Sequence, residues 1–150
     1  MKLIVTQELG KLAKWLRILG FDTEYFTCAK RGSLIIAALR DQRIIITRNH
    51  RLPRPAGMKI VLLESERIAE QIQETLKELK ISLNCDMMFR RCTICNAQLV
   101  GVSKEEIKDR IPEYVFNTQD DFNLCPVCRR IYWQGTHWGN VQETLARLQG

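Results

Sequence analysis

The sequence predicts an α/β fold in which a parallel sheet with flanking helices is followed by a small unit organised by four cysteines. Two observations carry this prediction. Short apolar segments alternate with amphipathic segments of helical spacing through the first 80 residues, which is typical of a parallel sheet covered by helices. Two Cys-x-x-Cys pairs then follow among shorter segments. With 150 residues, of which 45% are hydrophobic, the chain is long enough to bury a core without disulfides.

The N-terminal half is expected to alternate strands and helices. Residues 9–19 are predicted to be helical because Leu12, Ala13 and Leu16 share one face, and Gly20 is typical just past a helix end. The β-branched run at residues 44–46 favours a strand. In order, the expected elements are a strand at 2–6, a helix at 9–19, a strand at 23–27, a helix at 33–39, strands at 43–47 and 58–63, and a helix from 65 onward.

The carboxyl ends of these strands should meet at one edge of the sheet. Ligands of open α/β sheets bind at this edge, so functional groups are expected in the segments that follow the strands. These segments are residues 6–8, 27–31, 47–50 and 64–66.

The sequence divides into a predicted α/β domain at residues 1–83 and a predicted zinc-ribbon module with a terminal helix at residues 84–150. In the second part the sequence Ser103-Lys104-Glu105-Glu106 is typical of a capping box and predicts a short helix, which Pro112 should end. A strand at 131–133 and a terminal helix at 141–148 should follow.

Two cysteine pairs predict a structural zinc site. In a Cys-x-x-Cys turn the backbone folds back so that both sulfurs reach one metal, and two turns supply four thiolates. A closed set of four sulfurs leaves no open position for substrate, so a catalytic zinc is not expected. The lone Cys28 and Cys85 are expected to be small buried hydrophobic residues. The expected zinc ligands are Cys92, Cys95, Cys125 and Cys128.

Basic residues are concentrated in the N-terminal half. The chain has a net charge of +6, from 23 Lys and Arg against 17 Asp and Glu. Residues 27–59 hold eight basic side chains and one acidic side chain, a net charge of +7. A solvated face would explain this excess, but so local a positive charge also favours a polyanion. The expected nucleic-acid contacts are Lys11, Lys14, Arg17, Lys30, Arg31, Arg48, Arg51 and Arg54.

A set of motifs in this order resembles the Mut-seven C-terminal RNase domain family, in which a PIN-like nuclease fold precedes a zinc ribbon. The set comprises residues 10–17 (GKLAKWLR), Thr47-Arg48, both cysteine pairs, residues 102–106 (VSKEE) and residues 132–138 (YWQGTHW). The resemblance covers nearly the whole chain. It implies a PIN-like sheet and a ribonuclease whose carboxylates at the strand ends hold Mg²⁺ or Mn²⁺.

Most of the carboxylates that the resemblance implies are missing. Thr6 and Asn49 stand where aspartates are expected after two strands, and Lys30-Arg31 replace an acidic cluster. Neutral oxygens are poor ligands for a hard divalent cation, and basic side chains attract phosphate instead. The catalytic residues therefore stay undefined, with Glu8 as one possible remnant, and we expect the cleft to hold Mg²⁺ or Mn²⁺ poorly.

The favoured interpretation is a pseudoenzyme that keeps the nuclease fold and binds RNA, in an RNA-binding or ribosome-associated role. Two alternatives stay open: an active ribonuclease with rearranged ligands, and a module that regulates a protein partner. Convergence of Glu8, Glu64 and Glu66 with Asn49 would favour the active nuclease. The sequence has no apolar run long enough for a membrane span and no signal-peptide pattern, so a cytoplasmic location is expected.

Overall fold

The computed structural model describes residues 1–28, 30–134 and 136–149, but not the side chains of residues 31, 136–140 and 149. The chain divides into two compact units, Met1–Asn96 and Ala97–Gly150. The sequence placed the boundary at residues 83 and 84. The residues between the two boundaries belong to the first unit because they bond to it: the Phe89 N–H, for example, donates to the Ile18 carbonyl at 2.8 Å.

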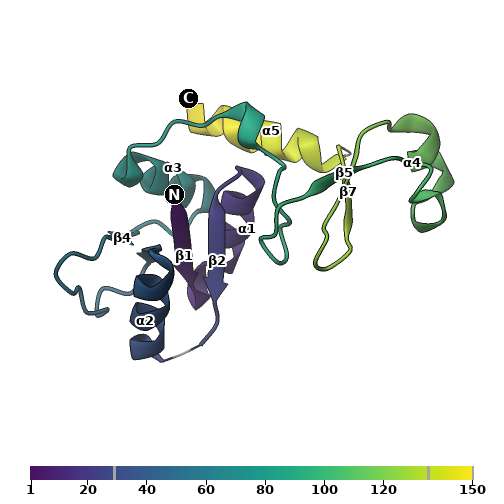
Figure 1. Ribbon diagram of the computed structural model, residues 1–150. Coiled ribbons are helices and arrows are strands. Elements are labelled where there is room, and N and C mark those ends of the chain that lie inside the picture. Colours follow the sequence, from purple (N-terminus) through teal and green to yellow (C-terminus); the bar gives the residue numbers. More distant parts are fainter. Residues whose placement is uncertain (29, 135, 150) are drawn as a thin grey trace. The chain divides into compact units, whose positions relative to one another are not determined.

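A four-stranded parallel sheet forms the centre of the first unit, as predicted (Figure 1). The strand order is β2-β1-β3-β4. In the register of the sheet, Ile4 lies between Glu24 on one side and Ile45 on the other. The strands are β1 (Lys2–Thr6), β2 (Asp22–Phe26), β3 (Ile44–Thr47) and β4 (Ile60–Leu62).

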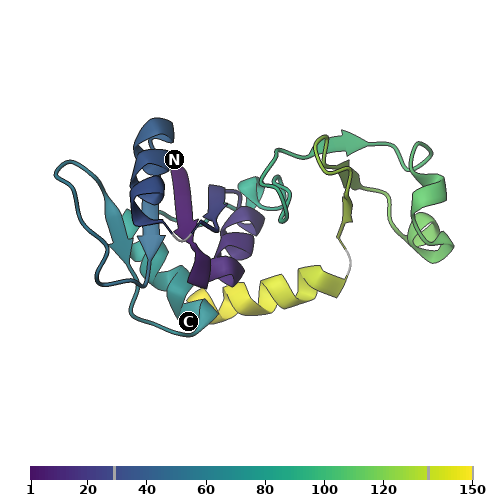
Figure 2. The same cartoon turned by 90° about the horizontal axis from the view of Figure 1, so that it is seen from below.

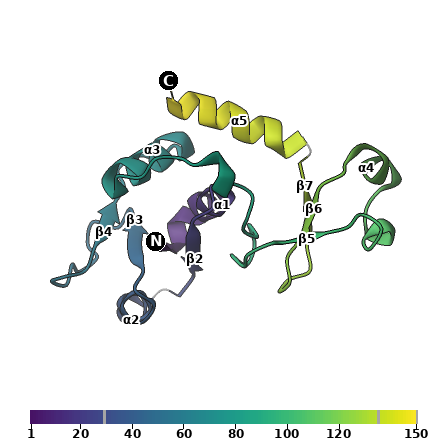
Figure 3. The ribbon, with the colours of Figure 1, turned by 45° about the horizontal axis from the view of Figure 1, so that its top comes forward.

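Helices cover both faces of this sheet (Figure 3). Helices α1 (Gly10–Ile18) and α3 (Ile68–Leu79) contact each other on one face, and α2 (Arg31–Asp41) lies on the other. The handedness of the connections explains this arrangement. The chain moves from β1 to β2 in one direction and from β2 past β1 to β3 in the other, so two right-handed crossovers place α1 and α2 on opposite faces.

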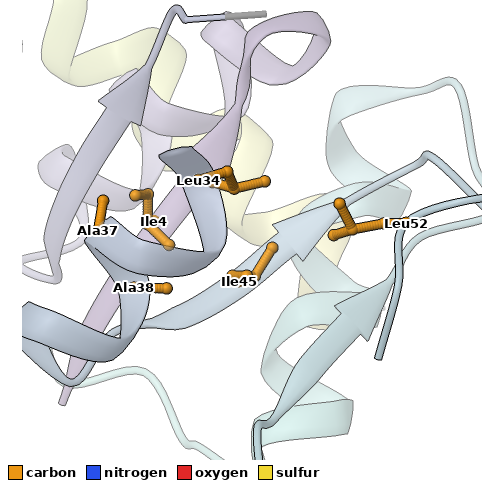
Figure 4. Packing of buried hydrophobic residues seen from close by; sticks show 6 residues of the cluster. All are labelled: Ile4, Leu34, Ala37, Ala38, Ile45 and Leu52. Carbon is orange, nitrogen blue, oxygen red and sulfur yellow. The ribbon is translucent and has the colours of Figure 1, made fainter. Parts of the chain in front are cut away.

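The core on the α2 face is built from small and branched side chains. Figure 4 shows Ile4 of β1 and Ile45 of β3 facing Leu34, Ala37 and Ala38 of α2. Ile4 and Ile45 are fully buried, so β1 and β3 are fixed tightly next to each other. This packing positions the carboxyl ends of the two strands.

The second unit contains a small antiparallel sheet of order β5-β6-β7, with a helix in the connection between β5 and β6 (Figure 2). Its core is formed by Ile107, Ile111, Val115 and Phe122, and the Phe122 ring lies 6.2 Å from that of Trp133. No helix among the described residues is both long and apolar enough to cross a membrane. The elements are β5 (Val100–Val102), η3 (Lys108–Arg110), α4 (Glu113–Thr118), β6 (Phe122–Leu124), β7 (Ile131–Trp133) and α5 (Thr136–Gln149).

The predicted helix between Ser103 and Pro112 is wrong. Residues 104–107 form turns, and the 3₁₀ segment η3 is the helical turn that precedes the proline. Helix α4 begins directly after Pro112, whose carbonyl accepts from the N–H groups of Val115 and Phe116. A proline lacks an N–H and has a fixed φ, which suits a helix start as well as a helix end.

Candidate nucleic-acid interface and metal centre

The topological switch point of the parallel sheet lies between β1 and β3. At these two neighbouring strands, the connections between the strands of the sheet diverge to its opposite faces. Ligands of open α/β sheets bind at such a place. Thr6 ends β1 and Thr47 ends β3, and their hydroxyl oxygens lie 3.0 Å apart. We call this place the carboxyl edge.

Glu8 is the centre of the hydrogen bonds at the carboxyl edge. Its Oε1 accepts from the Thr6 hydroxyl at 2.6 Å, the Thr47 hydroxyl at 3.1 Å and the Arg48 N–H at 3.1 Å. Burial raises the pKa of Glu8, but the hydrogen bonds from Thr6, Arg48 and Thr47 outweigh it and hold the pKa below its ordinary value. This carboxylate is therefore ionised and held by neutral donors of β1 and β3.

The other acidic residues of this edge lie beside a histidine and an arginine side chain. Glu64 lies 3.4 Å from His50, and Glu66 lies 3.6 Å from Arg48. Asn49 is turned toward its own loop, because its Oδ1 accepts from the Arg51 N–H at 3.0 Å. The convergence that would favour an active nuclease is thus not found: within the described residues, the four cysteines form the only group of three or more potential metal ligands.

The donor set of the carboxyl edge does not fit a hard divalent cation. A protein site for Mg²⁺ or Mn²⁺ supplies one or two carboxylates that are free to coordinate the ion, and waters or substrate phosphates complete the shell. Here Thr6, Thr47 and Asn49 present neutral groups, and the one carboxylate between the strands, Glu8, is already held by three donors. Arg48 adds a positive charge to the same edge.

Most of the predicted nucleic-acid contacts are placed on the surface. Lys11 and Lys14 are exposed on α1, and Lys30, Arg51 and Arg54 are exposed in the segments that follow β2 and β3. Arg48 is half-buried, and its side chain forms the long ion pair with exposed Glu66 described above. The side chain of Arg31 lies outside the described residues, as do those of His137 and Trp138.

Arg17 differs from the prediction because it is buried, with 6% of its surface exposed. Its Nε donates to the Thr23 carbonyl at 2.9 Å. Its Nη1 donates to the carbonyls of Thr93 and Ile94 at 2.9 and 3.1 Å. Arg17 therefore joins α1 to β2 and to the first cysteine turn, and its guanidinium donates to backbone carbonyls of both.

The four predicted zinc ligands come together. The sulfur atoms of Cys92, Cys95, Cys125 and Cys128 all lie within 4.8 Å of one another, the first cysteine of each pair being fully buried. These four residues are the cysteine cluster. The lone Cys28 and Cys85 are exposed, so the expectation that they are buried is wrong.

The two cysteine turns have the same backbone geometry. The Asn96 N–H donates to the Cys92 carbonyl, and the Arg129 N–H donates to the Cys125 carbonyl, both at 3.0 Å. Asn96 and Arg129 have φ angles of 70° and 66°, the left-handed conformation that closes such a turn. The Cys128 N–H also points at the Cys125 sulfur at 3.4 Å. This donor set fits a four-coordinate metal such as zinc and leaves no open position.

Asn96 attaches the first cysteine turn to the sheet, which the sequence analysis missed. Its Oδ1 accepts from the Thr23 N–H at 2.9 Å, and its Nδ2 donates to Asp22 at 2.7 Å. Burial raises the pKa of Asp22, but hydrogen bonds from Arg43 and Asn96 and the nearby arginine charges lower it below its ordinary value. The only sequence signal for this role is that Asn96 directly follows Cys95 and tolerates positive φ.

The comparisons with known proteins give one family. The family model described as the Mut7-C RNAse domain matches residues 1–145. No curated protein and no solved structure matches the chain. The matched residues include both the carboxyl edge and the cysteine cluster.

Proposed function

Because the chain belongs to the Mut7-C RNAse domain family, we propose that it binds RNA at the carboxyl edge of its sheet and that its ability to hydrolyse RNA is impaired. The binding surface consists of the basic residues that follow β2 and β3. We call it the basic edge surface, and it comprises Lys30, Arg48, Arg51 and Arg54.

The charge of this segment supports RNA binding. Residues 27–59 have a net charge of +7, and three of the four basic side chains are exposed. The fourth, Arg48, is paired with Glu66 at 3.6 Å, and an ion pair this long and exposed is weak in water. An RNA phosphate can therefore replace Glu66 at little cost, and the released counterions add to the affinity.

The hydrogen bonds of Glu8 carry the proposal of impaired hydrolysis. A carboxylate that accepts from Thr6, Thr47 and the Arg48 N–H fixes the ends of β1 and β3, as a structural residue does. With Glu64 beside His50 and Glu66 paired with Arg48, the edge does not bring its carboxylates together for a catalytic Mg²⁺ or Mn²⁺. The proposal of impaired hydrolysis is supported by these partners of Glu8, Glu64 and Glu66.

We assign zinc to the cysteine cluster. Four thiolates are the common ligand set of structural zinc, and zinc bound there would stabilise the fold without taking part in a reaction. Cys92 and Cys95 would hold it from the first turn, and Cys125 and Cys128 from the second.

The test of RNA binding compares two sets of substitutions that remove the same charge. The first is the triple variant Arg48→Ala, Arg51→Ala, Arg54→Ala. The control is the triple variant Lys2→Ala, Lys77→Ala, Arg147→Ala, whose residues are exposed and belong to none of the segments that follow the strands of the parallel sheet. The probes are a labelled single-stranded RNA and ribosomal RNA fragments, because the sequence interpretation includes a ribosome-associated role.

The basic edge triple variant should bind both probes more weakly, whatever their sequence. The slope of log K against log salt should fall by roughly one unit for each RNA phosphate that the substituted side chains no longer neutralise. The control triple variant should keep nearly the whole slope. Equal slopes for the two variants would contradict the proposed binding surface.

A further inference from the structure

A pocket of about 470 Å³ lies within the first unit, between α1, β2 and the first cysteine turn. It is lined by Gly10, Lys11, Lys14 and Arg17 of α1, Tyr25 of β2, and Ile94 of the turn, among others. We infer that this pocket takes one unpaired nucleobase of an RNA strand, stacked on Tyr25, while Lys11 and Lys14 hold the adjoining phosphates. The inference rests on the proposed RNA binding and adds a second, base-contacting site to the basic edge surface.

Tyr25 forms a wall of the pocket that is fixed in advance. Its hydroxyl donates to the Gln7 carbonyl at 2.6 Å. Its ring lies so close to the first turn of α1 that a methyl group on Gly10 would come 3.0 Å from the hydroxyl oxygen and 3.1 Å from the ring. The glycine therefore lets the ring pack there. Tyr25 is still 36% exposed, so a ligand can reach its ring. Because the Tyr25 side chain is already held in place, it loses little conformational entropy when a ligand stacks on it.

The opposite wall is also held in place. Thr93 and Ile94 line the pocket, and both of their carbonyls accept from the Arg17 guanidinium. The same guanidinium donates to Thr23 of β2 and so fixes the distance between the two walls. The Ile94 side chain is 45% exposed and offers an aliphatic surface.

The charge at the pocket is positive. Lys11 and Lys14 are three residues apart on α1 and so share one face of the helix, and both are exposed. No carboxylate lies among the lining residues. An anionic ligand is therefore favoured over a neutral or cationic one.

The combination of walls and charge identifies the class of ligand. A bare phosphate would use the two lysines but neither Tyr25 nor Ile94, whereas a base flanked by phosphates uses all four. The volume is that of a small-molecule pocket, which accommodates a single nucleotide. Bases within a duplex are stacked and paired, so only an unpaired base can enter and stack on an aromatic side chain.

The experiment compares binding of one labelled RNA as a single strand and as a duplex, using the full chain loaded with zinc. Tyr25→Leu removes the ring, and Tyr25→Phe keeps the ring but removes the hydrogen bond to Gln7. Ile94→Glu puts a negative charge on the other wall at an exposed site. Its control is Val127→Glu, at the equivalent position of the second cysteine turn, where Val127 is 69% exposed and does not line the pocket.

Wild type should prefer the single strand. Tyr25→Leu should lower single-strand affinity about 5- to 150-fold more than duplex affinity, the range expected for one stacked base, and Tyr25→Phe should keep the preference. Ile94→Glu should weaken single-strand binding more than Val127→Glu does, which gives an independent result if Tyr25→Leu fails to fold.

Two further outcomes separate this inference from the proposed function. If wild type binds RNA but Tyr25→Leu and Ile94→Glu keep its full single-strand preference, the pocket is not a base site, while the basic edge surface stands. If wild type binds neither the single strand nor the duplex, both the proposed RNA binding and the base site are overturned.

Discussion

The cysteine cluster and the carboxyl edge are the two places where this family's architecture implies a metal, and they present different side chains. The cluster has four sulfur atoms within 4.8 Å of one another. At the carboxyl edge, Glu8 accepts hydrogen bonds from two threonines, Glu64 lies beside His50, and Glu66 is paired with Arg48. One chain can thus present a complete ligand set for a structural metal beside an edge whose side chains are already paired with one another.

The largest effect is expected for a substitution that removes one ligand from the cysteine cluster. Cys92→Ser replaces a fully buried thiolate ligand, so zinc content should fall from about one per chain to near zero. Much of the roughly 10 kcal/mol that a structural zinc supplies should be lost from the free energy of unfolding. Elemental analysis and chelator-induced unfolding measure these two changes.

The matched control for this variant is Cys85→Ser. Cys85 is exposed and outside the cluster, so its substitution should leave zinc content and stability unchanged. Stoichiometric zinc in purified Cys92→Ser would contradict the four-cysteine site.

The next largest effect is expected for Arg17. Its substitution tests whether this arginine stabilises the fold or contacts RNA. Arg17→Met keeps an apolar side chain in the buried position but leaves the carbonyls of Thr23, Thr93 and Ile94 without this donor. The free energy of unfolding, measured in urea, should fall by about 3 kcal/mol. Arg40→Met, at a side chain that is 68% exposed, should leave it nearly unchanged. A stable Arg17→Met whose RNA binding loses about one unit of salt slope, as expected for one lost phosphate contact, would restore the original prediction for this residue.

The smallest effect tests the structural role of Glu8. Glu8→Gln should lower the free energy of unfolding at neutral pH by about 1 kcal/mol, a modest value because the carboxylate is exposed. The pKa of Glu8 is lowered in the fold, so its contribution is present above its ordinary value of 4.5 and is lost as pH falls through the folded pKa. The stability difference between wild type and Glu8→Gln should therefore shrink below about pH 4. A difference that grows in acid would contradict this account.

Features set by local sequence could be predicted. The parallel sheet and α1 follow from the spacing of apolar residues, and each cysteine turn is a local motif whose backbone bond spans Cys92 to Asn96 or Cys125 to Arg129. The convergence of the two cysteine turns agrees with the prediction that all four cysteines hold one metal, whereas the order of the strands was not predicted. The cytoplasmic location stays a prediction.

Features set by contacts between distant residues could not be predicted. Arg17 has the same spacing as Lys11 and Lys14, and only the carbonyls of residues 93 and 94 make it a buried donor. Glu8 meets Thr47 across 39 residues of sequence. Tyr25 and Ile94 carry no sign in the sequence of lining one pocket, because neither belongs to a motif that brings the other close.

The central claim is that the chain binds RNA without cleaving it, and one time course tests it most directly. Labelled single-stranded RNA is incubated with zinc-loaded wild type in Mg²⁺, in Mn²⁺ and without either, while binding and products are followed in the same samples. We expect bound, intact RNA under all three conditions. Metal-dependent products that disappear in Glu8→Gln or Glu64→Gln would contradict the claim and would identify the carboxyl edge as a rearranged active site.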